Sequence, residues 1–172
     1  NSLQERGFVQ ITAQVGCQVV DPAAEEIADF YDMFAHTEGL IASLAAERGS
    51  YAEVARLKEI NSSIARIDPS RADAADSYRM LNGDFHRLLH TMARSPIVSS
   101  RQLANSDFLI VQSCGFGVHL KDVAGEHDEI IAALEARNGE AARHASVVHL
   151  GSVSRDVVES LRVRGESADS CE

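Results

Sequence analysis

The chain of 172 residues is 45% hydrophobic and 24% charged, a balance that predicts one folded domain and excludes a disordered protein. Its net charge of −10 makes these residues alone poor binders of nucleic acid phosphates. The longest apolar runs are too short to span a membrane and no export signal is seen, so we expect a cytoplasmic protein without a membrane partner. Its three cysteines, Cys17, Cys114 and Cys171, are too widely spaced for a zinc knuckle and are expected to be reduced thiols.

The first 22 residues differ in pattern from the rest. Residues 1–7 read as the end of a helix that stops at Gly7. Residues 8–22 are rich in β-branched side chains on both sides of Gly16, which predicts a short two-stranded hairpin. An isolated hairpin is marginally stable, so we expect residues 1–22 to be the end of a larger unit and the chain to begin within a domain.

From residue 23 onward the pattern is helical. Apolar residues recur at intervals of three and four, the spacing of one buried helix face. Breaks at Gly-Ser, Asp-Pro-Ser, Ser-Pro, Gly-Phe-Gly and Asn-Gly-Glu divide the region, and short turns favour an antiparallel bundle. The fold class is therefore all-α, with six or seven helices after a β-hairpin, and residues 23–172 form the main domain. The expected helices span about 23–48, 51–67, 71–94, 97–114 and 118–137, with a sixth after the break at 138–140 that runs to about 161 and is followed by a frayed polar tail.

Histidines in three of these helices have positions suited to a metal site. Asn82 and His86 are four residues apart, and therefore lie one turn apart on the same helix face. His127 and His149 lie in the last two helices, 22 residues apart, a separation that places them level in two antiparallel helices joined by a tight turn. Three imidazoles and one oxygen can hold Zn²⁺, Ni²⁺ or Mn²⁺ with room for a further ligand.

A single histidine on a helix is more often a core or surface residue than a metal ligand. His36, His119 and His144 have no partner at ligand spacing, and they are interpreted as surface, interface or pocket-wall residues. His90 shares the face of His86 but lies two turns from Asn82, so it is expected to line a pocket instead of binding metal.

Three segments carry a recognisable pattern: YDMFAHTEGLIASLAAER in the first helix, LNGDFHRLLHTMARSPIV in the third, and GEHDEIIAALEARNGEAARHASVVHL across the last two. Together they resemble the FCD domain, the ligand-binding domain of FadR-like members of the GntR family of transcription regulators. The resemblance covers residues 23–161. It implies that residues 1–22 are the end of a winged-helix DNA-binding domain, with the recognition helix largely absent.

The resemblance also implies a divalent metal, zinc first with nickel or manganese as alternatives, held by one aspartate and three histidines. Those positions are His86, His127, His149 and, in place of the aspartate, Asn82. The departure at Asn82 leaves the site one negative charge short, so we expect weaker metal binding. Asp84 points to another part of the helix and does not replace it.

An effector pocket formed by Phe34, Glu38 and His90 is expected beside the metal. Where members of the family often have an arginine four residues before the glutamate, this chain has Phe34, which implies an effector that is less acidic or more aromatic. Phe34 equally fits a simple core position. The hairpin has no Lys or Arg between Gly7 and Pro22, so its own phosphate contacts are expected to be weak.

The resulting prediction is a homodimeric, effector-sensing domain that binds a small organic acid or similar metabolite and modulates operator DNA binding through the missing N-terminal domain. The alternative is a metal-dependent hydrolase or lyase that uses the same three histidines. Because no general base, nucleophile elbow or phosphate loop is apparent, and Glu126 is expected to point elsewhere, the non-enzymatic interpretation is preferred.

Overall fold

The computed structural model describes residues 9–12, 16–19, 22–103 and 120–169. Its first element is a hairpin of two antiparallel strands, β1 (Val9–Thr12) and β2 (Gly16–Val19), in which Gln10 pairs with Gln18. Gly16 has a φ of 143°, which a residue without a Cβ adopts readily. The predicted hairpin is therefore confirmed, whereas the helix expected over residues 1–7 lies outside the described residues.

The remaining described residues are helical, as the all-α prediction requires. Ser50 starts the second of these helices with a reciprocal cap: its hydroxyl accepts from the Glu53 backbone N–H at 3.3 Å, and the Glu53 carboxylate accepts from the Ser50 N–H at 2.8 Å. Pro96 opens a helical segment over residues 96–103, at a position where no N–H is needed. The other helices are α2 (Ala24–Arg48), α3 (Tyr51–Ala65), α4 (Ala74–Met92), α6 (Leu120–Glu135) and α7 (Gly139–Asp169).

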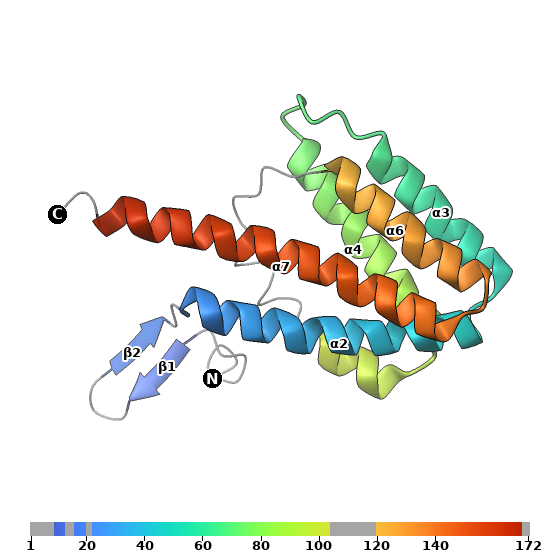
Figure 1. The fold of residues 1–172 in the computed structure, drawn as a ribbon, viewed down its shortest axis with the longest axis horizontal. Helices are drawn as coiled ribbons and strands as arrows, with labels where there is room; N and C mark the ends of the chain where they lie inside the picture. Colours follow the sequence, from blue (N-terminus) through green and yellow to red (C-terminus); the bar gives the residue numbers. More distant parts are fainter. Residues whose placement is uncertain (1–8, 13–15, 20–21, 104–119, 170–172) are drawn as a thin grey trace.

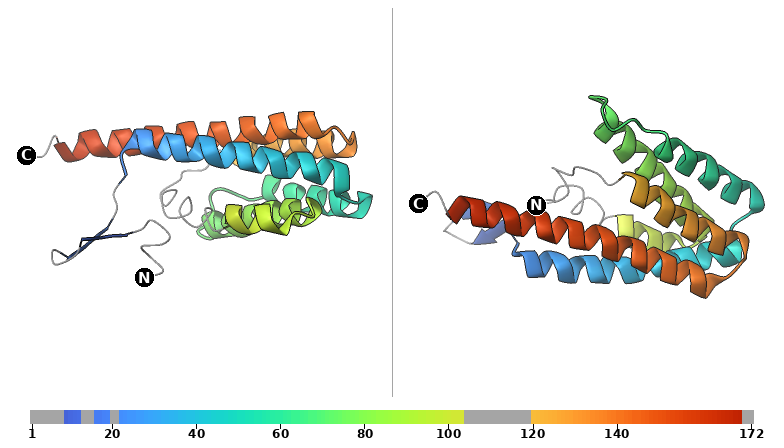
Figure 2. Two further views of the ribbon diagram at one scale, coloured as in Figure 1. Left: turned by 90° about the horizontal axis from the view of Figure 1, so that it is seen from below. Right: turned by 45° about the horizontal axis from the view of Figure 1, so that its top comes forward.

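Helices α2 and α7 lie side by side and antiparallel, and they form the longest pair of the bundle (Figure 1). Gly39 allows them to approach closely, because a Cβ at this position would lie 2.9 Å from Cγ2 of Val147 and 3.1 Å from the carbonyl oxygen of Arg143. Helices α3 and α4 pack on one side of this pair, as the left view of Figure 2 shows. Helix α6 bridges the two layers through contacts with α3 and α7.

Two apolar clusters hold these helices together. The larger one joins the C-terminal half of α2 to α3, α4 and α6, and its fully buried members include Ile41, Leu57, Phe85, Leu89 and Ile130. The smaller one lies between the N-terminal half of α2 and the later part of α7, and includes Ile27, Tyr31, Phe34, Leu150 and Val157. The polar site described below lies where these two clusters meet.

Several predicted boundaries differ from the structure. The last helix was expected to fray after about residue 161, and this is wrong: α7 continues to Asp169. Arg, Glu and Ala favour a helix even where nothing apolar is buried, and Arg162 donates to Glu25 of α2 at 3.3 Å. The fourth predicted helix is observed over residues 96–103, and its remainder lies outside the described part of the chain. Within the described residues, no helix combines the length and apolar character needed to cross a membrane.

Candidate metal centre

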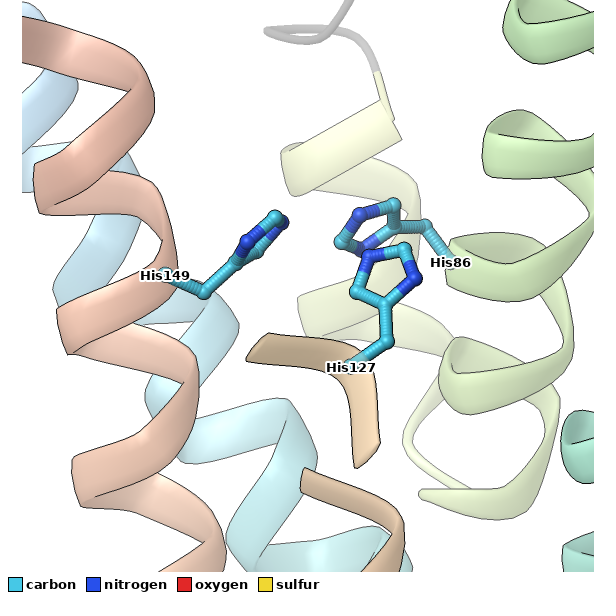
Figure 3. Close-up of side chains that lie close together, drawn as sticks. All are labelled: His86, His127 and His149. Atoms are coloured by element: carbon cyan, nitrogen blue, oxygen red, sulfur yellow. The ribbon is translucent and has the colours of Figure 1, made fainter. Parts of the chain in front are cut away.

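Three histidines from three helices meet inside the bundle. His86 of α4, His127 of α6 and His149 of α7 each offer one ring nitrogen, and these nitrogens all lie within 4.8 Å of one another. Figure 3 shows the three rings converging from separate helices. His127 and His149 are almost fully buried, and His86 is partly exposed. The predicted convergence of these residues is therefore observed, and the spacing of the donor atoms suits a single cation.

His127 is held by a hydrogen bond and by ring stacking. Its Nδ1 lies 3.2 Å from Oδ1 of Asn61, whose Nδ2 donates to the carbonyl oxygen of Ala124 at 2.8 Å and to Asp128 at 2.7 Å. Because Nδ2 is the donor of this amide, Oδ1 accepts and the proton of a neutral His127 lies on Nδ1. Phe85 stacks on the ring with centroids 3.9 Å apart. Nε2 of His127 therefore presents its lone pair to the other two histidines.

His149 is oriented in a similar way by a carboxylate. Its Nδ1 donates to Oε2 of Glu126 at 2.8 Å, which leaves Nε2 as the acceptor nitrogen. Glu126 directly precedes His127 in α6, but it reaches across to α7. A carboxylate behind a ligating imidazole is a common arrangement around protein-bound metals, because it fixes the tautomer and makes the ring a better donor.

His86 belongs to a second buried group that includes Glu38 and His90. The Oε1 atom of Glu38 accepts from Nε2 of His90 at 2.7 Å, and its Oε2 atom lies 3.5 Å from Nδ1 of His86. Glu38 is only 1% exposed, so this carboxylate is enclosed by α2 and α4. The geometry therefore links the predicted pocket residues Glu38 and His90 directly to one of the converging histidines.

The electrostatics of the centre favour neutral imidazoles and an ionised carboxylate. Burial lowers the pKa of His127 well below its usual value, and the neighbouring His149 and His86 lower it further. Burial also lowers the pKa of His149, although its hydrogen bond to Glu126 opposes the shift. For Glu38, burial raises the pKa, but the hydrogen bonds and charges of His86 and His90 outweigh it and bring the pKa to about 2. At neutral pH the buried rings keep the lone pairs that a metal needs.

Two unpartnered atoms are consistent with a bound cation. Nε2 of His127 and Oδ1 of Asn82 are both buried and have no hydrogen-bond partner. Asn82 lies one turn before His86 on α4, on the same helix face. Buried polar atoms in native proteins are almost always satisfied, so a lone pair left over at this place fits a metal ligand. The residues present therefore fit a divalent metal with three nitrogen donors and one amide oxygen.

Comparison with known proteins identifies the family. A model of the FCD domain matches residues 29–152. The chain belongs to the FCD domain family. Its structure is similar to Streptococcus agalactiae GntR, with a TM-score of 0.61 and 20% identity over 90% of this chain and 78% of that one. It is also similar to E. coli McbR/YncC, with a TM-score of 0.73 and 13% identity over 92% and 81% of the two chains. No curated protein matches the sequence.

The FCD match agrees with the resemblance seen in the sequence, and the structural likenesses show a shared fold. Other predicted residues of this FCD domain occupy varied positions. Phe34 is buried in the smaller apolar cluster, with its ring 6.4 Å from that of Phe30. Its role as a pocket wall stays a prediction. His36 is exposed beside Asp32, His144 is exposed, and His119 lies outside the described residues.

Asn61 and Glu126 are the residues that sequence reasoning missed. Asn61 was not considered, and Glu126 was expected to point elsewhere because neighbouring residues diverge on a helix. That divergence is correct with respect to His127, but it directs Glu126 toward His149 on the next helix. An acidic residue next to a candidate metal ligand was therefore a sequence signal that could have identified Glu126.

Among the described residues, a surface hollow of about 290 Å³ lies between the end of α3 and the start of α4. None of the three histidines lines it.

Proposed function

We propose that this FCD domain is the effector-sensing part of a DNA-binding transcription regulator and that it works with a divalent metal. Asn82, His86, His127 and His149 would hold the ion, with zinc as the first candidate. The observation that carries the proposal is the convergence of three imidazole nitrogens, one from each histidine, within 4.8 Å of one another. The metal would supply a Lewis-acid centre to which an acidic group of a small metabolite binds.

The protein chain would position the effector and couple its binding to the packing of the helices. The three histidines come from α4, α6 and α7, so a ligand at this centre is connected to three separate helices. A ligand changes a conformational equilibrium only by binding two arrangements unequally. We propose that effector binding favours one packing of these helices, and that the N-terminal DNA-binding part of a homodimer responds to it. The β1–β2 hairpin would be the wing of that part.

A regulatory role is preferred over the hydrolase or lyase alternative. Glu126, one of the two acidic residues next to His127 in sequence, bonds the outer nitrogen of His149 and so lies behind that ring. Glu38, whose carboxylate is buried, is engaged by His90. These contacts are better suited to orienting the histidine side chains than to transferring a proton to a substrate.

Metal analysis tests the proposal. Purified wild-type protein is expected to bind one equivalent of zinc, and His127→Ala and His149→Ala are expected to abolish that binding. The exposed residues His36 and His144 provide matched controls, and alanine at either position should leave metal content unchanged. Equal metal content in the wild type and in folded His127→Ala and His149→Ala variants would reject the site.

A further inference from the structure

The proposed ligand set contains no negative charge. Three neutral imidazoles and the amide oxygen of Asn82 would leave a divalent cation inside the bundle with its full positive charge. An uncompensated charge in a protein interior is strongly unfavourable, so carboxylates outside the ligand set have to offset it. Glu126, which lies behind His149 and is partly exposed, provides one such charge. A second carboxylate would complete the balance.

Glu38 is a buried carboxylate on the α2 side of the centre. One of its oxygens, Oε1, accepts from Nε2 of His90 at 2.7 Å, whereas the other, Oε2, is buried and has no hydrogen-bond partner. This free oxygen lies 3.5 Å from Nδ1 of His86. The charge of Glu38 also reaches His149, where it opposes the burial that lowers the pKa of that ring. The carboxylate is therefore next to one proposed ligand and acts on a second.

No lysine or arginine accompanies this buried carboxylate. Among the described residues, the ion pairs of Glu38 are with His86 and His90. None of the lysine and arginine side chains that the structure describes is buried. The two imidazoles carry no permanent charge. Because a buried carboxylate without a cation is costly, a metal at the neighbouring centre would be the counter-charge that Glu38 lacks.

His90 holds the carboxylate in this orientation. It lies one turn after His86 on α4, it is 6% exposed, and it occupies the oxygen of Glu38 that is not beside His86. Helix α4 therefore carries both a proposed metal ligand and the residue that orients the buried charge.

Building on the proposed function, we propose that Glu38 supplies to the metal centre, from α2, the negative charge that Asn82 does not provide. The charge expected on α4 is thus moved to a neighbouring helix, and His90 keeps it in place. The three histidines come from α4, α6 and α7, so Glu38 also couples α2 to the metal.

Removal of the charge at residue 38 tests the proposal. Glu38→Gln keeps the size of the side chain and an oxygen for His90 but loses the charge, so zinc affinity in chelator competition should fall by about tenfold or more. Glu47→Gln, at an exposed position of the same helix, is the matched control and should leave zinc affinity unchanged. A zinc affinity of folded Glu38→Gln equal to that of the wild type would overturn the proposal.

A second substitution distinguishes a role of the charge from a purely structural role. Asn82→Asp returns a carboxylate to α4, and in the Glu38→Gln protein it should raise zinc affinity by a larger factor than in the wild type. The gain is smaller in the wild type because the introduced carboxylate and Glu38 repel each other there. Residues that share one function are not additive in this way by chance. Equal gains in the two backgrounds, or no gain after Glu38→Gln, would overturn the proposal.

A measurement on the wild type does not depend on whether the variants fold. Addition of zinc to metal-free protein should shift the ¹³C resonance of the Glu38 side-chain carboxyl, because a divalent charge arrives beside it. The corresponding resonance of the exposed Glu47 should not move. A Glu38 resonance that is unchanged in zinc-saturated protein would contradict the proposed charge pairing. Folding of each variant is checked by circular dichroism.

The zinc content of the wild type separates the two proposals. Zinc bound equally tightly by the wild type and by folded Glu38→Gln would overturn only the role of Glu38. Absence of zinc binding in the wild type would overturn the metal-dependent function, and the role of Glu38 with it.

Discussion

The contact between Asn61 and His127 offers the sharpest test of how the site is built. Asn61 is 2% exposed, and its amide satisfies His127 Nδ1, the carbonyl oxygen of Ala124 and the carboxylate of Asp128. In Asn61→Ala, the exposed Asp128 can bind water and the Ala124 carbonyl, inside α6, keeps its helical hydrogen bond, but the buried His127 N–H is left without an acceptor. One unsatisfied buried group costs about 1–3 kcal/mol, so we expect the free energy of unfolding to fall by about that amount.

Metal binding should fall as well, because His127 loses the contact that fixes its tautomer. Loss of such an outer partner weakens metal affinity by about 10- to 100-fold. The affinity is measured by competition with a chromogenic chelator, and stability by urea unfolding of metal-free protein. Asn61→Leu keeps more side-chain volume while removing the acceptor, and Ser62→Ala is an exposed neighbouring control. A zinc affinity within threefold of wild type in folded Asn61→Ala and Asn61→Leu would refute the reasoning.

Three further predictions concern the surroundings of the proposed metal. Glu126→Ala should weaken zinc binding about 10- to 100-fold in chelator competition, because His149 loses its carboxylate, while the exposed Glu129→Ala should not. Asn82→Asp should strengthen zinc binding at least about tenfold by adding a negative charge to the ligand set; unchanged affinity would show that residue 82 is not a ligand. Unfolding of metal-free protein by urea should become easier as the pH falls below 6.5, the usual pKa of histidine, because the unfolded chain binds protons at His127 and His149 that the native state resists. Equal stability at pH 7.5 and 5.5 would contradict this assignment.

The periodic apolar residues were sufficient to predict the helical architecture. Breaks at Gly49 and at Asn138 correspond to real helix ends, since α2 stops at Arg48 and α7 starts at Gly139. The end of α7 was not predictable in the same way. Its last turns carry a polar sequence that fits both a frayed tail and a solvent-exposed helix, and polarity alone does not distinguish them.

The histidines were predictable because helix spacing and the length of an antiparallel turn place them level with one another. Their outer partners were not. Asn61 reaches His127 from α3, and Glu126 reaches His149 from α6, so both contacts depend on how separate helices are rotated against each other. Single-helix periodicity says which face is buried, but it does not say which polar side chain on a neighbouring helix is within hydrogen-bond distance.

X-ray absorption spectroscopy of the zinc-loaded protein tests the central claim most directly. The account predicts one zinc ion per chain with three imidazole nitrogens and at least one oxygen in its first coordination shell. In His86→Ala, the imidazole scattering should decrease because one of the three rings is removed. A zinc environment dominated by oxygen or sulfur ligands, or one that is identical in wild type and His86→Ala, would contradict it.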